Sequence, residues 1–417
     1  MIGGKVALKL APHVLRELSC GVQTVTVTGT NGKSTTTRMV CAAVETAGPV
    51  ISNVNGDNMP PGVTAAFISS PDARMAAIEV DEMHLPIVAD QTDPDVMILL
   101  NLSRDQLDRV GEIGTVERRL RQAVTEHPDA TVVANCDDPL IASAAWDGKH
   151  VVWVAAGSDW TDDSVGFPRG GRVVRSAGTW RVPGTSFQRP DPDWWLEDVR
   201  LGAQPCATLH GPDGQWPLSI ALPGRANLAN AAQAIAAAVT VGIPVEHAIA
   251  AVGTVTEVAG RYSTFDVDGR EVHLMLAKNP AGWQEAMTMI DPAVNQVAVV
   301  VNGQIPDGQD LSWLWDVDFS RLNTGPARRV VAFGERGADL AVRLEYAGIH
   351  CTRVAHPMEA IKSFEPGPVE VLANYTSFRD LKCELDRLDR VSRATCHDRP
   401  VGRPSHPDSL DQQGGVS

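Results

Sequence analysis

Short runs of apolar and β-branched residues alternate with longer helical stretches along much of the chain. Between residues 24 and 135 the apolar runs read TVTVT, PVISN, RMAAIEV, DVMILLNL and ATVVAN. Strands separated by helices are typical of βαβ units, so this region predicts a parallel sheet covered by helices. The rhythm resumes after Gly260 with EVHLMLA, QVAVVVN, RRVVAFG and VEVLANY, which predict a second, smaller α/β domain.

The pattern changes between these two regions. Residues 151–217 are rich in Gly, Pro, Trp and Arg, which indicates a β-rich insert with short strands. Residues 226–242 then predict an alanine-rich helix that ends at a glycine. We therefore predict an α/β protein whose first domain covers 1–258, with the insert at about 151–217. The second domain covers 259–393, and the polar residues 394–417 form a disordered tail.

Composition excludes several classes of protein. The chain has 417 residues, a formal net charge of −15 and no basic stripe, which argues against a nucleic-acid partner. No apolar run is long enough to span a membrane, and the N-terminal residues lack the apolar centre of a signal peptide, so we expect a cytoplasmic protein. The 7 cysteines are scattered without a Cys-x-x-Cys pair, which argues for reduced thiols and against a cysteine-ligated zinc site.

The segment Val25–Thr37, VTVTGTNGKSTTT, has the pattern of a phosphate-binding loop. A β-branched strand ends at Gly29, and a helical stretch begins at Lys33. Glycines let backbone N–H groups approach phosphate oxygens, and a helix N-terminus adds partial positive charge. Lys33 would reach the terminal phosphates of ATP, and the Ser34 hydroxyl would bind Mg²⁺.

This loop departs from the general motif at Thr28, where a glycine is usual. The alternative is a plain glycine turn between a strand and a helix, with a lysine that contacts no phosphate. We favour ATP binding because strand, glycine loop and helix occur in the required order. The predicted nucleotide-binding residues are Thr28, Gly29, Thr30, Asn31, Gly32, Lys33, Ser34 and Thr35.

Acidic residues follow the predicted strand RMAAIEV. Carboxylates at the C-terminal edge of a parallel strand face the crevice where ligands bind, and Mg²⁺ prefers oxygen ligands. We predict that Glu79 joins Ser34 as a Mg²⁺ ligand, with Glu82 and Asp81 as alternatives. A solvated acidic strand end is the structural alternative.

Polar residues also follow the strand DVMILLNL. They would lie at the same crevice edge or form only a helix cap with a charged first turn. These residues are Asn101, Arg104, Asp105, Gln106 and Asp108.

Four sequence blocks now point to a family. GTNGKST, IEVDE, NLSRDQLDRVGE and LPGRANLANAAQA occur in the order found in Mur ligase central domains. The form RDQLDRVGE, with LAKNPAGWQE and DGQDLSWLWDVDF further along, resembles the MurT family. MurT proteins are the Mur ligase-like synthetase subunits of lipid II isoglutaminyl synthase. The resemblance covers nearly the whole chain except the insert and the tail.

The resemblance implies a nucleotide site between a Mur ligase central domain and a smaller C-terminal domain. Asn227 and Asn230, three and six residues after Gly224, would face the adenine or the phosphates, although Asn227 is also suited to cap the alanine-rich helix. Arg261 would approach the γ-phosphate as the domains close. Lys278 and Asn279 would contact nucleotide and acyl substrate from the C-terminal domain.

A second group of polar residues lies in DGQDLSWLWDVDF. Asp307 and Asp310 are candidates for contacts to the nucleotide ribose. Trp313 and Trp315 would face either the core or a partner, and the core is the commoner place for tryptophan.

The implied reaction is ATP-dependent amidation of the D-glutamate α-carboxylate in lipid II, with ammonia from glutamine. Glutamine hydrolysis needs an activated cysteine, and Cys20, Cys41 and Cys136 all lie at strand or helix positions rather than in a nucleophile elbow. The resemblance therefore implies a separate GatD-type glutaminase subunit. Asp339 resembles the aspartate that completes the partner's Cys–His–Asp arrangement, although an acidic residue near a helix start is also an ordinary surface feature.

Too little chain precedes Val25 to form the domain with which Mur ligases hold a UDP-linked precursor, which fits a lipid-linked substrate. We expect at most peripheral membrane contact, through that substrate, at the inner face of the cytoplasmic membrane. Two alternatives remain open. One is an amino-acid-adding ligase of the Mur or folylpolyglutamate class, and the other is a nucleotide-binding subunit without turnover.

The insert is the clearest departure from the family. Many MurT proteins carry a four-cysteine zinc ribbon there, whereas this chain has Phe167, Gly170, Val182 and Thr185 at the corresponding positions. We predict no zinc, because the remaining Cys206 cannot hold a metal alone. Hydrophobic contacts would hold the insert together instead, through Trp180, Trp194 and Trp195.

Overall fold

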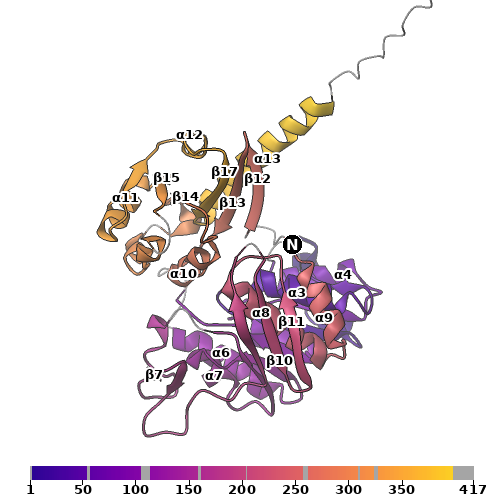
Figure 1. Cartoon of the computed structure of the whole chain (residues 1–417). Coiled ribbons are helices and arrows are strands. Elements are labelled where there is room, and N and C mark those ends of the chain that lie inside the picture. Colours follow the sequence, from indigo (N-terminus) through magenta and orange to yellow (C-terminus); the bar gives the residue numbers. More distant parts are fainter. Residues whose placement is uncertain are drawn as a thin grey trace, which may run out of the picture.

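The computed structural model describes residues 2–53, 57–104, 113–157, 161–202, 204–256, 262–308, 310–323 and 327–397. These residues form a nine-stranded sheet, a six-stranded sheet and a separate two-stranded hairpin. Figure 1 shows two bodies, one around each large sheet, with the second sheet following the first along the chain.

The nine-stranded sheet has the strand order β11-β10-β9-β6-β5-β4-β1-β3-β2. The strands β1 to β6 are parallel, as the alternating sequence pattern predicts for β1 to β5, and β9 to β11 continue the sheet mainly in antiparallel pairing. The strand bounds are β1 Gln23–Thr28, β2 Val50–Ile51, β3 Met75–Glu79, β4 Val96–Leu99, β5 Thr131–Asn135, β6 His150–Ala155, β9 Trp194–Arg200, β10 Cys206–Gly211 and β11 Gly214–Ser219.

Helices cover both faces of this sheet because its central strands are apolar on both sides. Along β4, Val96 and Ile98 pack on one face, whereas Met97 and Leu99 pack on the other. The first face is covered by α3 Lys33–Val44, α8 Arg225–Thr240 and α9 Val245–Gly253. The second face is covered by α2 Val14–Ser19, α4 Pro60–Ser69, α5 Leu85–Thr92, α6 Ile113–Glu126 and α7 Pro139–Ala145, and α1 Ile2–Leu10 packs on α4.

The six-stranded sheet has the order β12-β13-β17-β14-β15-β16, and all its pairs are parallel except the β12–β13 hairpin. Its strands are β12 Tyr262–Val267, β13 Arg270–Leu276, β14 Gln296–Val300, β15 Arg329–Phe333, β16 Cys351–Arg353 and β17 Gly367–Ala373. One face packs on α10 Pro280–Met289 and α11 Gly337–Tyr346, and the other on α12 Pro357–Lys362 and α13 Tyr375–His397.

The second domain meets the first through its helix α10, which contacts α8 (Figure 1). At the far end of the chain, α13 runs to His397, four residues past the predicted domain end at Arg393. The rest of the predicted tail, residues 398–417, lies outside the described residues.

The insert is narrower than residues 151–217. Strands β6 and β9 to β11 belong to the large sheet, so the separate part is the hairpin of β7 Val174–Ser176 and β8 Thr179–Arg181 with its flanking loops. The prediction for Trp180 is confirmed, because its side chain lies in a small core with Phe167 and Val182. These two residues stand at positions where many MurT proteins have zinc-ribbon cysteines. The other two, Gly170 and Thr185, are exposed.

The two other tryptophans also make contacts within residues 151–217, on Trp216 and His210, but these contacts belong to the large sheet and not to the hairpin region. Trp194 begins β9 and packs in the core of the large sheet. Trp195 points to the opposite face, is 38% exposed and stacks on His210 of β10. Neighbouring residues on a strand face opposite sides, so the two tryptophans cannot both fill the insert.

In the part of the chain that the structure describes, every helix is too short or too polar to span a bilayer.

Candidate active site

The predicted phosphate loop connects β1 to α3 at the C-terminal edge of the nine-stranded sheet. Two of its glycines are required by geometry. Gly29 has a φ of 138°, and a Cβ there would lie 2.8 Å from the Leu100 Cβ. Gly32 has a φ of 86°, and its Cβ would lie 2.8 Å from the Asn230 side chain on α8. A side chain at either position would therefore displace the loop.

Residues just beyond β4 fasten this loop. The Asn31 N–H donates to the Asn101 Oδ1 at 2.9 Å, and the Asn101 amide donates back to the Asn31 carbonyl at 3.0 Å. Thr30 and Ser103 are joined in the same two-way manner, by bonds of 3.1 and 3.0 Å. Asn101 thus lies at the crevice edge as expected, and its role is to fix the backbone of the loop.

Lys33 is buried at the first position of α3. Its Nζ donates to the Gly29 carbonyl at 2.5 Å and lies 2.8 Å from the Glu82 Oε1. The ammonium group is thereby held beneath the loop, where the helix N-terminus adds further positive potential. Ser34, the next residue, is half-buried in the same helical turn. Lys33 and Glu82 are therefore in direct contact, and Ser34 follows Lys33 in the same helical turn.

Glu79 lies beside them, because its strand pairs with β1 in a register that sets Glu79 opposite Val27. Its side chain is buried and accepts a hydrogen bond from the Asn58 amide at 3.2 Å. Asp81 instead accepts from the Met83 N–H and contacts His84 Nδ1 at 2.9 Å, so it shapes the turn after β3.

The opposite wall of the crevice comes from the C-terminal domain. Asn279 caps α10 by accepting from the Gly282 N–H at 2.8 Å, and its Oδ1 also accepts from the Asn31 amide at 3.3 Å. This bond joins the phosphate loop to the second domain. Lys278 lines the adjoining pocket together with Asn227, Asn230 and Thr35. These residues therefore line one pocket, and their contacts to a nucleotide remain a prediction.

Asn227 does not cap the alanine-rich helix. The N-cap position of α8 is Gly224, and the Asn227 amide donates to the Pro223 carbonyl at 2.6 Å. Gly224 has a φ of 93°, and a Cβ there would come within 2.5 Å of the Met289 side chain of the second domain.

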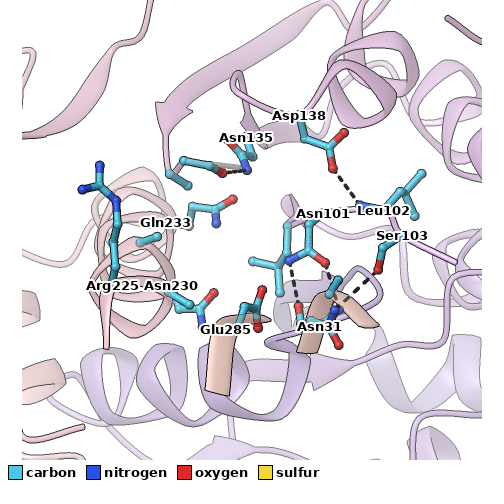
Figure 2. A pocket seen from close by; sticks show the side chains of 16 residues that line it. Asn31, Asn101, Leu102, Ser103, Asn135, Asp138, Arg225, Asn230, Gln233 and Glu285 are labelled. Carbon is cyan, nitrogen blue, oxygen red and sulfur yellow. Dashed lines mark hydrogen bonds between the residues drawn. The ribbon is translucent and has the colours of Figure 1, made fainter. Parts of the chain in front are cut away.

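Figure 2 shows a pocket between the phosphate loop and α8 that sequence reasoning covered only in part. Gln233 points into it between Asn135 and Asn230, and its buried Oε1 lacks a hydrogen-bond partner within the described chain. Glu285 reaches the pocket from α10. Its spacing in the sequence could have identified Gln233 as a site residue, because it follows Asn230 by three residues and so lies on the same helix face.

Asp138 forms the back of this pocket and was not predicted. Its carboxylate caps α7 and also accepts from the Leu102 N–H at 2.8 Å, which ties β5 to the segment after β4. Complete burial raises the pKa of Asp138 to about 6, although the backbone N–H donors act in the opposite direction. The residue holds the crevice edge in place from behind.

Asp307 and Asp310 lie outside both cleft pockets. Asp307 is buried and accepts from the Thr376 N–H at 2.9 Å, from the Thr376 hydroxyl and from the Gln304 N–H at 3.3 Å. Asp310 is exposed and accepts from the Ser312 N–H at 2.8 Å. Asp307 is engaged in capping, whereas Asp310 keeps an exposed carboxylate, and contacts of either residue to the nucleotide ribose remain a prediction.

Asp339 lies in the first turn of α11 and is exposed. Its carboxylate pairs with the Arg336 Nε at 2.8 Å, and this hydrogen bond lowers the pKa of Asp339. The two tryptophans of the segment DGQDLSWLWDVDF differ in exposure. Trp313 is buried against Trp283, whereas Trp315 is 57% exposed and packs on Tyr346 of α11.

Four predicted residues lie outside the described chain: Arg261, Asp105, Gln106 and Asp108. Arg104, the last described residue before that gap, is exposed and pairs with Asp163 of the insert region.

Two family models match the chain in the order of its two large sheets. The Mur ligase middle domain matches residues 27–164, and the MurT ligase C-terminal domain matches residues 276–378. The MurT subunit of lipid II isoglutaminyl synthase from Streptococcus pneumoniae is 29% identical over 409 residues, which cover 91% of each chain. The subunit of the same name from Staphylococcus aureus is 26% identical over 408 residues and 92% of each chain.

Solved structures confirm the fold. MurF from Acinetobacter baumannii superposes with a TM-score of 0.70 at 18% identity, covering 91% of this chain and 80% of MurF. MurF ligase from Thermotoga maritima, solved in complex with ADP, gives 0.66 at 15% identity, covering 89% and 81%. The predicted α/β architecture, the sequence blocks and these matches agree: the chain has the Mur ligase fold, and its two parts resemble the Mur ligase middle domain and the MurT ligase C-terminal domain.

Proposed function

We propose that this protein is the synthetase subunit of a two-protein amidotransferase that converts the D-glutamate of the lipid II stem peptide to D-isoglutamine. The observation that carries the proposal is the cleft itself. A phosphate loop with a buried lysine faces the Lys278–Asn279 segment of a domain that matches the MurT C-terminal model. The relatives matched over nine-tenths of their length carry the name of that synthase subunit.

ATP is the nucleotide best suited to this cleft. Lys33 and the backbone N–H groups at the start of α3 form a positively charged cradle for the terminal phosphates. Asn230 lies against the loop and also lines the pocket that Asn227 and Lys278 enclose, so it is placed to contact the rest of the nucleotide. Arg261 remains our candidate for a further charge contact on the γ-phosphate.

The residues at the phosphate loop also fit Mg²⁺. Glu82 contacts Lys33 directly, so phosphate groups entering the loop would meet a carboxylate of the same charge. A divalent cation removes that repulsion, and Ser34, Glu79 and Glu82 supply the hydroxyl and carboxylate oxygens that Mg²⁺ prefers. When bound, Mg²⁺ would neutralise charge on the transferring phosphoryl group.

The chemistry then follows from the weakness of a carboxylate as an electrophile. The substrate α-carboxylate attacks the γ-phosphorus of ATP, an acyl phosphate forms and ADP leaves. Lys33 stabilises the charge on the phosphoryl oxygens, and the walls of the cleft keep water from the reactive acyl phosphate. Ammonia attacks the acyl carbon, phosphate leaves with the bonding electrons, and the amide remains after loss of a proton.

We propose that ammonia comes from a second polypeptide. The buried Cys41 and Cys136 have pKa values raised by burial to about 11 and about 12, so neither is an activated thiolate. We propose a GatD-type glutaminase as the partner and Asp339 as the residue that this chain contributes to the partner's Cys–His–Asp arrangement. Asp339 is exposed, and its bond to Arg336 would have to open for that role. The complex would act at the inner face of the cytoplasmic membrane, where its lipid-linked substrate lies.

The decisive experiment is reconstitution. The full chain is purified with the glutaminase subunit, supplied with lipid II, ATP, Mg²⁺ and glutamine, and the product is weighed by mass spectrometry. Replacement of OH by NH₂ supports the proposal. A product heavier by an amino-acid residue would identify an adding ligase instead, and unchanged lipid II would indicate a subunit without turnover.

A further inference from the structure

A second cavity lies next to the nucleotide cleft, between the β7–β8 hairpin and the end of the nine-stranded sheet. Its volume is about 590 Å³, and it shares Ala156, Gly157, Arg225 and Ala229 with the pocket of Figure 2. The two spaces are therefore neighbours along one face of α8. None of the roles proposed above uses this cavity.

Three arginines line the cavity: Arg175 from β7, Arg189 from the loop before β9, and Arg225 from the start of α8. Among the residues that the structure describes, Asp137 is the acidic residue in its lining. Such a concentration of guanidinium groups is unusual on a chain with a formal net charge of −15. We name this space the arginine cavity.

Two of the arginines are fixed by structural bonds. The Arg189 Nε donates to Asp137 at 2.6 Å, and Arg175 donates to the carbonyl and hydroxyl of Ser164. A guanidinium carries five N–H donors, so the bond to Asp137 fixes Arg189 and leaves further donors on that side chain. Asp137 is itself occupied on both oxygens, since its Oδ2 accepts from the Gly157 N–H at 2.7 Å.

Of the three arginines that line the cavity, Arg225 gives the strongest indication of a ligand. Within the described chain it forms neither a hydrogen bond nor an ion pair, and Figure 2 shows its guanidinium pointing away from the phosphate loop. It is also the first residue of α8, where a positive side chain is unfavourable to the helix dipole. Arg225 is exposed, so its guanidinium is open to a ligand with negative charge.

We propose that the arginine cavity binds an anionic group of the acceptor substrate, distinct from the carboxylate that is activated. This inference rests on the proposed function, because it takes the acceptor to lie in the adjoining pocket. The planar guanidinium matches paired oxygens of phosphate and carboxylate groups alike, so the ligand chemistry is an oxyanion carried by the acceptor. The two sources that share this chemistry are a pyrophosphate and a second carboxylate.

The test is a direct binding measurement on the full chain with ADP present at saturation, so that the phosphate loop is filled. Sodium pyrophosphate and glutarate are titrated separately by isothermal calorimetry. Arg225→Glu is the informative variant, since glutamate at a helix start favours folding. Arg181→Glu is the matched control, because Arg181 is an exposed arginine on the same hairpin outside the cavity lining.

We expect one of the two anions to bind and Arg225→Glu to weaken it by roughly tenfold or more, while Arg181→Glu leaves it within about twofold. The anion that binds identifies the source. In the amidation assay the same variant raises the KM for the acceptor and leaves the KM for ATP unchanged. Absence of binding by both anions, or equal behaviour of the two variants, would overturn the proposal. The calorimetric result does not depend on amidation, so it separates failure of this site from failure of the proposed function.

Discussion

The loop after β1 and the loop after β14 look alike in sequence but have opposite roles. Each follows a buried parallel strand and carries glycine with charged residues. In the first loop, the backbone is held by Asn101 from outside, and its N–H groups at the start of α3 remain directed toward the cleft. In the second, the carboxylate of Asp307 turns inward and bonds to Thr376 at the start of α13. The two loops thus differ in what holds them: a side chain from the segment after β4 fixes the first loop, whereas the second loop is bonded to the start of α13.

The largest expected effect is on the rate of amidation, which a substitution in the first loop should lower and a substitution in the second loop should not. Lys33→Ala removes the positive charge beneath the phosphate loop, and we expect the rate of amidation to fall by about a thousandfold, as for loss of a transition-state charge contact. Asp310→Ala, in the second loop, should leave the rate within about twofold. Steady-state kinetics of both variants checks the comparison, and a slow Asp310→Ala enzyme would restore the second loop as part of the site.

A substitution of Asp307 tests the same comparison through the free energy of unfolding. Asp307→Ala leaves the buried Thr376 N–H and hydroxyl without an acceptor, so we expect a loss of about 3 kcal/mol in the free energy of unfolding. Chemical denaturation measures this value, and ADP affinity serves as the control. If stability is unchanged while ADP binding weakens, the assignment of Asp307 as a structural cap is incorrect.

Charged residues of the second sheet should also affect stability rather than catalysis. His273 on β13 lies 3.1 Å from the buried Glu370 and 3.2 Å from Glu271, and chiefly the hydrogen bond to Glu370 raises the pKa of His273 from 6.5 to about 9. Because the folded pKa lies above the unfolded one, the stabilisation is complete below pH 6.5 and is lost as the pH rises through about 9.

We therefore expect the free energy of unfolding to fall by about 2 kcal/mol between pH 6 and 9.5, beyond the change seen in a Glu370→Gln variant. Denaturation at several pH values measures the difference. Equal pH profiles for the two proteins would show that this histidine is not coupled to the carboxylate.

The smallest expected effect is on stability, and it comes from a substitution in the turn of the β7–β8 hairpin beside the arginine cavity. Ala177 has a φ of 48° and Gly178 a φ of 76°, so both central residues of the β7–β8 turn are left-handed. Asparagine tolerates this conformation better than alanine, and Asn-Gly is the favoured pair for such a turn. Ala177→Asn should raise the free energy of unfolding by about 0.5 kcal/mol without changing the rate. A destabilised variant would show that the turn is not strained at Ala177.

Much of the fold was predictable because its cause is local. Alternating apolar positions on β4 predict a strand buried on both faces, and the spacing of such strands predicts a parallel sheet. The insert at about residues 151–217 was harder to predict. Trp194 and Trp195 are adjacent in sequence and seemed equivalent, yet the strand pairing placed one in the main core and the other at the surface.

The sequence by itself determined the phosphate loop, because its glycines, lysine and serine are required in that order by backbone geometry and charge. It also determined the resemblance to the MurT family, through blocks spread over both domains. Only the tertiary structure decided which polar residues share a cleft. Asn31 meets Asn279 across 248 positions of sequence, Gln233 turns into the same pocket, and Asp307 turns away from it. Such contacts depend on how two sheets and their helices pack, and a local pattern carries no record of that packing.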